Sequence, residues 1–226
     1  MVEIGATTRR ARLATAPGAG RKAVLLDRDG VINVERGYLH RVEDFAFVPG
    51  SVEALRRLQS DGWALVVVTN QSGIARGLYS EADYQRLTAH MRAELAAAGV
   101  HLDAVLHCPH LPDASVPAYR RDCDCRKPAP GLLLRAAAEL GLDLAASVLV
   151  GDKGSDVAAG RAAGVGRCVL VRSGHALSAV DLQAADAVHD DLAQWVRALA
   201  HARQPMPRPP RPDSARHATG QTRRRS

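Results

Sequence analysis

The sequence predicts an α/β domain with a doubly wound, mostly parallel sheet, for two reasons. Three short apolar runs each end in a polar residue; they are 22–26 before Asp27, 63–68 before Thr69, and 147–151 before Asp152. Apolar runs of this length are typical of parallel strands that are buried on both faces. Segments with helix signals separate the runs, and this alternation of strand and helix indicates βαβ units.

Five segments carry the apolar spacing and the flanking residues of helices. They are residues 51–60, 80–98, 132–140, 157–163 and 192–199. The second is the clearest, because Ser80 and Asp83 form a capping-box pattern and Gly99 follows the last turn. Shorter apolar segments predict further strands, the last of them at an edge of the sheet; they are residues 103–106, 167–171 and 187–188.

The length of 226 residues suits one domain, which we place at 21–200, between extensions at 1–20 and 201–226. The extensions carry net charges of +2 and +6, whereas the domain carries −2. A nearly neutral domain requires no nucleic-acid partner. The Pro- and Arg-rich segment 201–226 predicts a disordered, solvated tail, with a tether to nucleic acid or an anionic surface as the alternative.

No apolar run approaches the roughly 20 residues that a membrane span requires, and no stretch near the start has the pattern of a signal peptide. We therefore expect a cytoplasmic protein without a membrane partner. A monomer is the default expectation.

Asp27 and Asp29 follow the first predicted strand, two residues apart on one side of the chain. Carboxylates this close repel each other unless a cation lies between them or one holds a proton. Mg²⁺ binds one or two carboxylates together with a phosphate oxygen, and Asp can also act as a covalent nucleophile. We interpret Asp27 as the nucleophile and Asp29 as the general acid and base. The alternative is a cap at Asp27 and a turn at Asp29-Gly30.

Three further elements lie where a parallel sheet collects ligand-binding residues, at the ends of strands or the starts of helices. They are Thr69-Asn70-Gln71-Ser72, Arg126-Lys127-Pro128 and Gly151-Asp152-Lys153. A hydroxyl and an amide at Thr69 and Asn70 can donate to phosphoryl oxygens, although both residues also favour caps at strand ends. Lys127 offsets phosphoryl charge, and Asp152 completes a Mg²⁺ site with Asp27.

Three of the four cysteines cluster with one histidine, as Cys108-Pro109-His110 and Cys123-Asp124-Cys125. A set of three Cys and one His is a common structural zinc site. The spacing is tighter than that of the usual zinc knuckle, and a Cys123–Cys125 or Cys108–Cys123 disulfide is the alternative. Cys168 lies in a predicted buried strand and is expected to be a small core residue. The other histidines, among them His175, are expected to be surface or packing residues.

The four elements resemble, in order, the motifs of the haloacid dehalogenase superfamily of phosphohydrolases. Three longer stretches are more specific; they are residues 66–77, 108–110 and 123–128. These are similar to the D-glycero-D-manno-heptose-1,7-bisphosphate 7-phosphatase family, over roughly residues 22–200. The resemblance implies a haloacid-dehalogenase-like Rossmannoid fold, a zinc-stapled loop and release of a 7-phosphate in the synthesis of nucleotide-activated heptose for surface glycans. No long insertion separates the motifs, so we expect no large cap domain and an open site.

The resemblance also implies roles for individual residues. The catalytic set is Asp27, Asp29, Thr69 and Lys127. Mg²⁺ is bound by Asp27, Asp152 and the backbone of Asp29, and Zn²⁺ is bound by Cys108, His110, Cys123 and Cys125. The substrate is a small sugar bisphosphate, bound also by the loop Glu35-Arg36-Gly37-Tyr38, the segment Thr69-Asn70-Gln71-Ser72, and Arg126, Lys127 and Lys153. Glu35 departs from the small polar residue usual in that family.

Three alternatives remain open at the level of sequence. A histidinol-phosphate phosphatase uses the same catalytic residues, so only turnover separates it from the heptose enzyme. A nucleic-acid 3′-phosphatase would rely on the basic tail, which the charge of the domain disfavours. A zinc-dependent binding module without catalysis is disfavoured because no catalytic position is missing.

Overall fold

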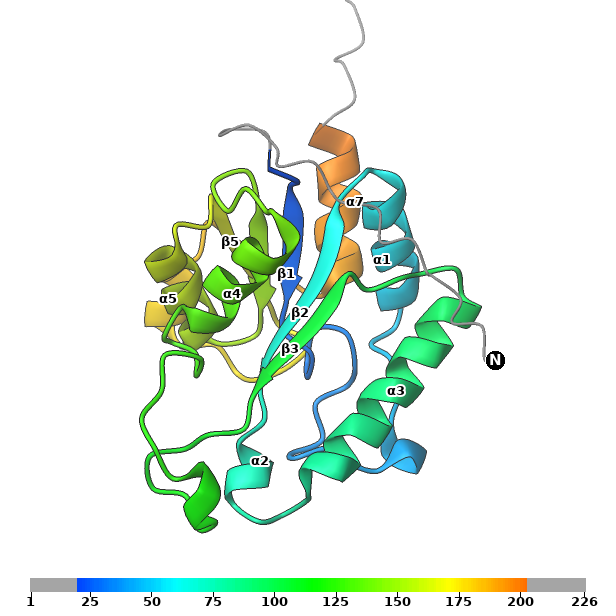
Figure 1. The fold of residues 1–226 in the computed structure, drawn as a ribbon. Coiled ribbons are helices and arrows are strands. Elements are labelled where there is room, and N and C mark those ends of the chain that lie inside the picture. Colours follow the sequence, from blue (N-terminus) through cyan, green and yellow to red (C-terminus); the bar gives the residue numbers. More distant parts are fainter. Residues whose placement is uncertain (1–19, 203–226) are drawn as a thin grey trace, which may run out of the picture.

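The computed structural model describes residues 20–202 of the chain. Most of the two basic extensions, including the predicted disordered tail, lies outside the described residues. Within 20–202 the chain forms one sheet with helices on both faces (Figure 1). The predicted fold class is confirmed.

All six strands of the sheet are parallel, in the spatial order β3-β2-β1-β4-β5-β6. Their bounds are β1 Ala23–Leu26, β2 Ala64–Asn70, β3 Ala104–Cys108, β4 Val148–Gly151, β5 Arg167–Val171 and β6 Ala187–His189. The chain builds the sheet outward from β1 in one direction, then returns to add β4 on the other side. Ligands bind beyond the carboxyl ends of strands at such a reversal. The site is therefore expected where β1 and β4 end.

Seven α-helices connect the strands in the described part of the chain. They are α1 Ser51–Ser60, α2 Ser72–Ala75, α3 Glu81–Ala97, α4 Gly131–Leu140, α5 Gly154–Ala163, α6 Ala179–Ala184 and α7 Leu192–Ala202. Short 3₁₀ turns add η1 Val42–Asp44 and η2 Pro117–Tyr119. Between β1 and β2 the chain forms only η1 and α1, so no inserted domain separates these strands.

Two hydrophobic cores lie on opposite faces of the sheet. Val24 and Leu26 of β1 pack into the core shared with α1, α3 and α7, whereas Leu25 packs into the core shared with α4 and α5. Successive strand residues point to opposite faces, which is why every residue of β1 is apolar and buried. Figure 1 shows α1, α3 and α7 on one side of the sheet and α4 and α5 on the other.

The predicted helices are confirmed, including the capping box in which Ser80 and Asp83 exchange hydrogen bonds at the start of α3. The sequence did not predict α2 or α6. The first has only four residues, and the second buries none of its residues, so neither shows an apolar stripe. Among residues 20–202, no helix combines the length and the apolar character that crossing a bilayer demands.

Candidate active site

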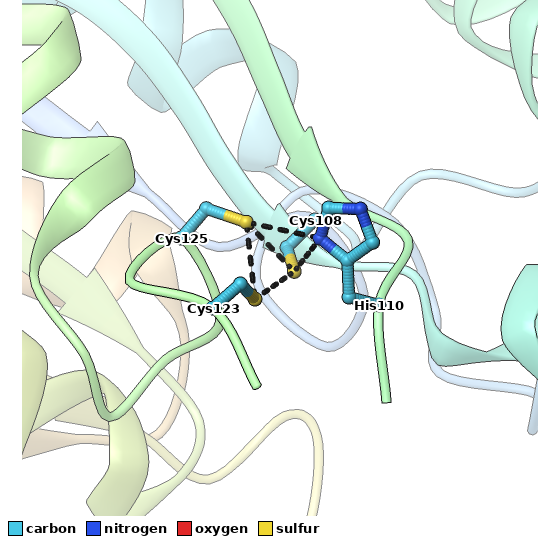
Figure 2. Close-up of side chains that lie close together, drawn as sticks. All are labelled: Cys108, His110, Cys123 and Cys125. Carbon is cyan, nitrogen blue, oxygen red and sulfur yellow. Dashed lines mark hydrogen bonds between the residues drawn. The ribbon is translucent and has the colours of Figure 1, made fainter. Parts of the chain in front are cut away.

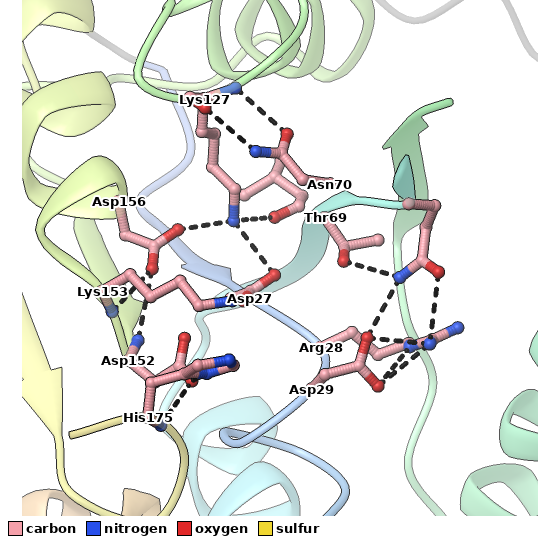
Figure 3. A network of polar contacts seen from close by, with 12 residues as sticks. Asp27, Arg28, Asp29, Thr69, Asn70, Lys127, Asp152, Lys153, Asp156 and His175 are labelled. Carbon is pink, nitrogen blue, oxygen red and sulfur yellow. Dashed lines mark hydrogen bonds and ion pairs between the residues drawn. The ribbon is translucent and has the colours of Figure 1, made fainter. Parts of the chain in front are cut away.

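A polar pocket of about 250 Å³ lies at the carboxyl end of the sheet, and side chains from four strand ends reach it (Figure 3). Its lining residues are Asp27, Asp29, Glu35, Gly37, Tyr38, Thr69, Asn70, Gln71, Ser72, Tyr79, Lys127, Lys153, Ser155, Asp156 and His175. The structure thus brings together residues from all four sequence elements. Arg36 and Arg126 are the two predicted substrate-binding residues that do not line it.

The pairing of β1 with β4 sets the position of the first carboxylates. Leu26 is in register with Val150, and the Asp27 N–H donates to the Val150 carbonyl at 2.9 Å. Asp27 therefore leaves β1 beside the end of β4, where Asp152 follows after Gly151. The structure brings the two carboxylates together as the sequence predicted.

Lys127 is the cation of this cluster, and its side chain is only 2% exposed. Its Nζ lies 3.0 Å from Asp27 Oδ1 and 2.5 Å from Asp156 Oδ1. It also donates to the Val68 carbonyl at 2.8 Å. Burial on its own would lower the pKa of Lys127, but the two carboxylates raise it above its ordinary value. The ammonium group is therefore charged and fully paired.

The backbone of Lys127 is fixed by the side chain of Asn70. Asn70 Nδ2 donates to the Lys127 carbonyl at 2.9 Å, and the Lys127 N–H donates to Asn70 Oδ1 at 3.1 Å. Both polar atoms of the amide are occupied by these bonds. Asn70 also lines the pocket, and the second N–H of its amide remains free to donate there.

Three carboxylates cluster here, since oxygens of Asp27, Asp152 and Asp156 lie within 4.8 Å of one another, and Lys127 pairs with the first and the last of them. The oxygens of Asp156 are used by the protein: Oδ1 by Lys127, and Oδ2 by the N–H groups of Asp152 and Lys153. Burial, reinforced by Asp27, raises the pKa of Asp156 to about 6 despite the lysine. Both oxygens of Asp156 are therefore already bound by the protein.

Asp152 differs from Asp156, since its Oδ1 is buried without a hydrogen-bond partner. Burial and the neighbouring Asp27 raise the pKa of Asp152, which means that its negative charge is poorly compensated by the protein alone. A buried carboxylate oxygen without a partner is costly. Lys127 pairs with Asp27 and Asp156, whereas the charge of Lys153 and the hydrogen bonds from His175 only partly offset the charge of Asp152. The donor set therefore fits a hard divalent cation such as Mg²⁺, held by Asp27 and Asp152.

Asp29 lies on the other side of the pocket from Lys127, against Arg28 (Figure 3). Its Oδ2 accepts from Arg28 Nη2 at 2.8 Å and from Gln71 Nε2 at 3.1 Å. Its Oδ1 accepts from Asn33 Nδ2 at 2.9 Å. Burial on its own would raise the pKa of Asp29, but the guanidinium and these hydrogen bonds lower it below its usual value. Asp29 is a carboxylate in this state.

Gln71 connects Asp29 with the predicted phosphate-binding hydroxyl. Its Nε2 also donates to Thr69 Oγ1 at 3.0 Å, while its Oε1 accepts from the Tyr79 hydroxyl at 2.6 Å. Because Tyr79 can only donate to the amide oxygen, it fixes the orientation in which Nε2 faces Asp29.

The loop at residues 35–38 forms one rim of the pocket. Glu35 Oε1 accepts from the Gly37 N–H at 2.6 Å, and Tyr38 has a φ of 57° while lying 47% exposed. A left-handed conformation is uncommon for an aromatic residue and is found most often at functional sites. Arg126 lies elsewhere, where its Nη1 donates to the His110 carbonyl at 3.3 Å.

The four predicted zinc ligands form a compact cluster beside this site (Figure 2). Cys125 Sγ lies 3.2 Å from Cys108 Sγ, 3.3 Å from Cys123 Sγ and 3.4 Å from His110 Nδ1. All four cysteines of the chain are free thiols, so the disulfide alternatives are wrong. A tetrahedral zinc site with bonds of about 2.3 Å has sulfur–sulfur edges of about 3.8 Å, and a small expansion of the cluster reaches that geometry.

Several residues of the pocket were not predicted from the sequence. Asp156 was treated only as part of a helix start, Tyr79 was not considered, and His175 was expected to be a surface or packing residue. His175 is a surface residue as expected, with its side chain 42% exposed, but the sequence did not predict that it lines the pocket with its Nδ1 2.6 Å from Asp152 Oδ2. The Gly-His pair after a predicted strand was the one available signal, because polar residues at that place face the site.

Comparison with known proteins places this architecture among phosphatases. Residues 124–195 match the HAD-hydrolase-like family model. The chain is 49% identical over 183 residues to the D-glycero-beta-D-manno-heptose-1,7-bisphosphate 7-phosphatase of Escherichia coli (strain K12), covering 81% of this chain and 96% of that protein. It is 47% identical over 157 residues to a D-glycero-alpha-D-manno-heptose-1,7-bisphosphate 7-phosphatase of Photorhabdus laumondii, covering 70% and 86%.

A solved structure is also similar, that of D,D-heptose 1,7-bisphosphate phosphatase from B. bronchiseptica in complex with magnesium and phosphate. It superposes with a TM-score of 0.69 at 34% identity, covering 80% of this chain and 99% of that one. The match therefore extends over the whole described domain rather than over the motifs alone.

Proposed function

We propose that this chain, which belongs to the D-glycero-D-manno-heptose-1,7-bisphosphate 7-phosphatase family, is a Mg²⁺-dependent phosphomonoesterase that removes the 7-phosphate of that sugar bisphosphate. One observation carries the chemistry: Asp27 leaves a parallel strand beside the unpartnered oxygen of Asp152, and Lys127 is paired with Asp27 at 3.0 Å. The identity of the substrate is supported by the relatives at 47–49% identity.

Asp27 acts as the nucleophile. Its carboxylate attacks phosphorus in line and forms an aspartyl-phosphate, while the bond from phosphorus to the sugar oxygen breaks. Lys127 holds that carboxylate in position from 3.0 Å and offsets negative charge on the phosphoryl group. The oxygen of Thr69 accepts from Gln71, so its own hydroxyl hydrogen remains free to donate to a phosphoryl oxygen in the pocket that it lines.

Asp29 transfers the protons. A phosphate dianion bound beside it raises its pKa, so that it arrives at the transition state with the proton that the leaving sugar oxygen needs. After giving this proton to the leaving oxygen Asp29 is a carboxylate, and its contact with Arg28 favours that ionised form for the second step. As a carboxylate it takes a proton from the water that hydrolyses the aspartyl-phosphate.

Asp27, Asp152 and the backbone of Asp29 are the residues that would hold Mg²⁺. The ion supplies charge neutralisation for the carboxylates and the phosphoryl oxygens. The set Cys108, His110, Cys123 and Cys125 would hold a structural Zn²⁺. Because Cys125 is two residues before Lys127, that site would order the loop that carries the lysine.

The reduced thiols support a cytoplasmic location, where a zinc–thiolate set is stable against oxidation. We take the protein to act as a monomer on a small sugar bisphosphate. The rim residues Glu35, Gly37 and Tyr38, together with Lys153, are the candidates for contacts with the sugar. Arg36 and Arg126, which do not line the pocket here, are candidates for its distal phosphate.

The test is phosphate release with Mg²⁺ from the α and β anomers of heptose 1,7-bisphosphate and from histidinol phosphate, at matched concentrations. We expect a preference for one heptose anomer of at least 100-fold in kcat/KM, which corresponds to about 2.7 kcal/mol of transition-state discrimination. Comparable turnover of histidinol phosphate would keep the chemistry and overturn the substrate. Turnover of a DNA 3′-phosphate with strong salt dependence would favour the nucleic-acid alternative.

A further inference from the structure

His175 lines the pocket, and both of its hydrogen bonds go to Asp152, a proposed metal ligand. It lies in the segment after β5, where the chain folds back over the end of β4 (Figure 3). Its Nδ1 lies 2.6 Å from Asp152 Oδ2, and its own backbone N–H donates to the same oxygen at 2.9 Å. One carboxylate oxygen therefore receives two hydrogen bonds from a single residue.

The two oxygens of Asp152 consequently differ. Oδ2 is bound twice by His175, whereas Oδ1 is buried and has no partner. A carboxylate can only accept, so Nδ1 carries the proton in this contact. The imidazole removes the freedom of the carboxylate to rotate and leaves one oxygen for a metal.

The backbone of two glycines, Gly30 and Gly174, packs closely against the same carboxylate. A Cβ at Gly30 would lie 2.6 Å from Asp152 Oδ2, and a Cβ at Gly174 would lie 2.0 Å from it. Gly30 also has a φ of +83°, which favours glycine independently. Oδ2 therefore lies against the backbone of both glycines and also contacts the ring of His175.

Glu35 approaches the same ring nitrogen as Asp152, with its Oε2 at 3.8 Å from Nδ1, and the ligand atoms of all three residues lie within 4.8 Å of one another. Its other oxygen is fixed by the Gly37 N–H at 2.6 Å. The Nδ1 atom of His175 therefore lies near both Glu35 of the pocket rim and the buried Asp152.

We propose that His175 is a positioning residue for the divalent metal, which fixes Asp152 so that Oδ1 alone is presented to the ion. This inference rests on the proposed function, because it takes Asp152 as a metal ligand. Residues that hold a metal ligand in place typically contribute 10- to 100-fold in metal affinity. The backbone N–H of residue 175 remains in any side-chain variant, so we expect about the lower end, roughly tenfold.

The test is a titration of the substrate-free, zinc-loaded full chain with Mn²⁺, a spectroscopic substitute for Mg²⁺, in which electron paramagnetic resonance measures the free ion. We expect His175→Ala to bind Mn²⁺ about tenfold more weakly than the wild type. His175→Asn should recover most of the affinity, since its Nδ2 can occupy the place of Nδ1. His101→Ala is the matched control, because that histidine is exposed before β3, at the opposite end of the strands.

Equal Mn²⁺ affinity in His175→Ala and the wild type would overturn the inference, as would a failure of His175→Asn to recover any affinity. Asp152→Asn separates this failure from that of the proposed function. If the wild type binds Mn²⁺ no better than Asp152→Asn, the metal site itself is wrong. Thermal unfolding of each variant verifies that the fold is retained.

Discussion

Lys127→Met isolates the electrostatic role of the buried ammonium group. The side chain of Lys127 is 2% exposed and lies between Asp27 Oδ1 and Asp156 Oδ1. Methionine fills most of the same volume but cannot donate, so the two carboxylates and the Val68 carbonyl each lose a partner. The substitution therefore removes charge and hydrogen bonds without leaving a large cavity.

The expected loss of unfolding free energy is about 3–5 kcal/mol at pH 7.5, the usual result of removing one partner from a buried ion pair. Typical domains have a total stability of roughly 5–15 kcal/mol, so this loss is a substantial fraction. Added Mg²⁺ should restore part of it, because a cation near Asp27 again offsets the negative charge.

Urea denaturation without added Mg²⁺, followed by tryptophan fluorescence, measures this change, since Trp195 is 1% exposed in the core. Lys153→Met is the matched control. Lys153 also lines the pocket, but it is exposed, so Lys153→Met should change the unfolding free energy by no more than about 0.5 kcal/mol. A loss in Lys127→Met no larger than that of the control would refute the assignment of Lys127 as a buried counter-ion.

The loss should also depend on pH. Asp156 already has a pKa raised to about 6, chiefly by burial, and losing the lysine raises it further. The folded variant then binds a proton that the unfolded chain releases near pH 4, so its stability falls as pH rises above that value. The difference from the wild type should be smaller at pH 5 than at pH 7.5. A constant difference would contradict the charge-based explanation.

Three further substitutions test other parts of the site. Asp27→Asn should lower phosphate release by at least about 10⁴-fold and abolish trapping of a phosphorylated enzyme; retained turnover would exclude the covalent mechanism. Tyr79→Phe removes the hydrogen bond that orients the Gln71 amide toward Asp29, so kcat/KM should fall about tenfold for an alkyl phosphate but stay unchanged for p-nitrophenyl phosphate, whose leaving group needs no acid. Tyr84→Phe is the control, and equal losses for both substrates would disprove the positioning of Asp29 by Tyr79 through Gln71. Cys123→Ser should release zinc, measured by elemental analysis, and lower the melting temperature, whereas Cys168→Ser should retain the metal.

Much of the site could be predicted because its residues follow apolar strands. Asp27, Thr69 and Asp152 each end a buried run, and parallel strands end at one edge of the sheet. The cysteine cluster could be predicted as well, since its donors lie within a short stretch whose composition suits zinc.

The remaining residues depend on contacts that local sequence does not encode. Asp156 lies in the first turn of α5, where acidic residues are common, and only the fold brings it to Lys127. His175 follows β5 at a distance of 23 residues from its partner Asp152. Asn70 lines the pocket, as a phosphate-binding residue would, and the bonds of its amide to the backbone of Lys127 are a second role that the sequence did not predict. Such pairings appear only once the sheet order is known.

The pairing of β1 with β4 determines when during folding each metal can bind. It joins parts of the chain far apart, as in the bond from the Ala23 N–H to Ser147 Oγ, 124 residues later. Loop closure over such a distance is slow, so the Mg²⁺ ligands meet only when the sheet is nearly complete. Mg²⁺ therefore stabilises the finished fold by mass action and slows its unfolding.

The candidate zinc ligands span a much shorter segment, with Cys108 and Cys125 separated by 17 residues. A loop of that length closes early, so Zn²⁺ can bind to a chain whose sheet is still incomplete. Zinc depletion would then slow the folding reaction, whereas Mg²⁺ depletion would leave the folding rate unchanged and accelerate unfolding. Zinc would thus change the rate of folding, and Mg²⁺ the rate of unfolding.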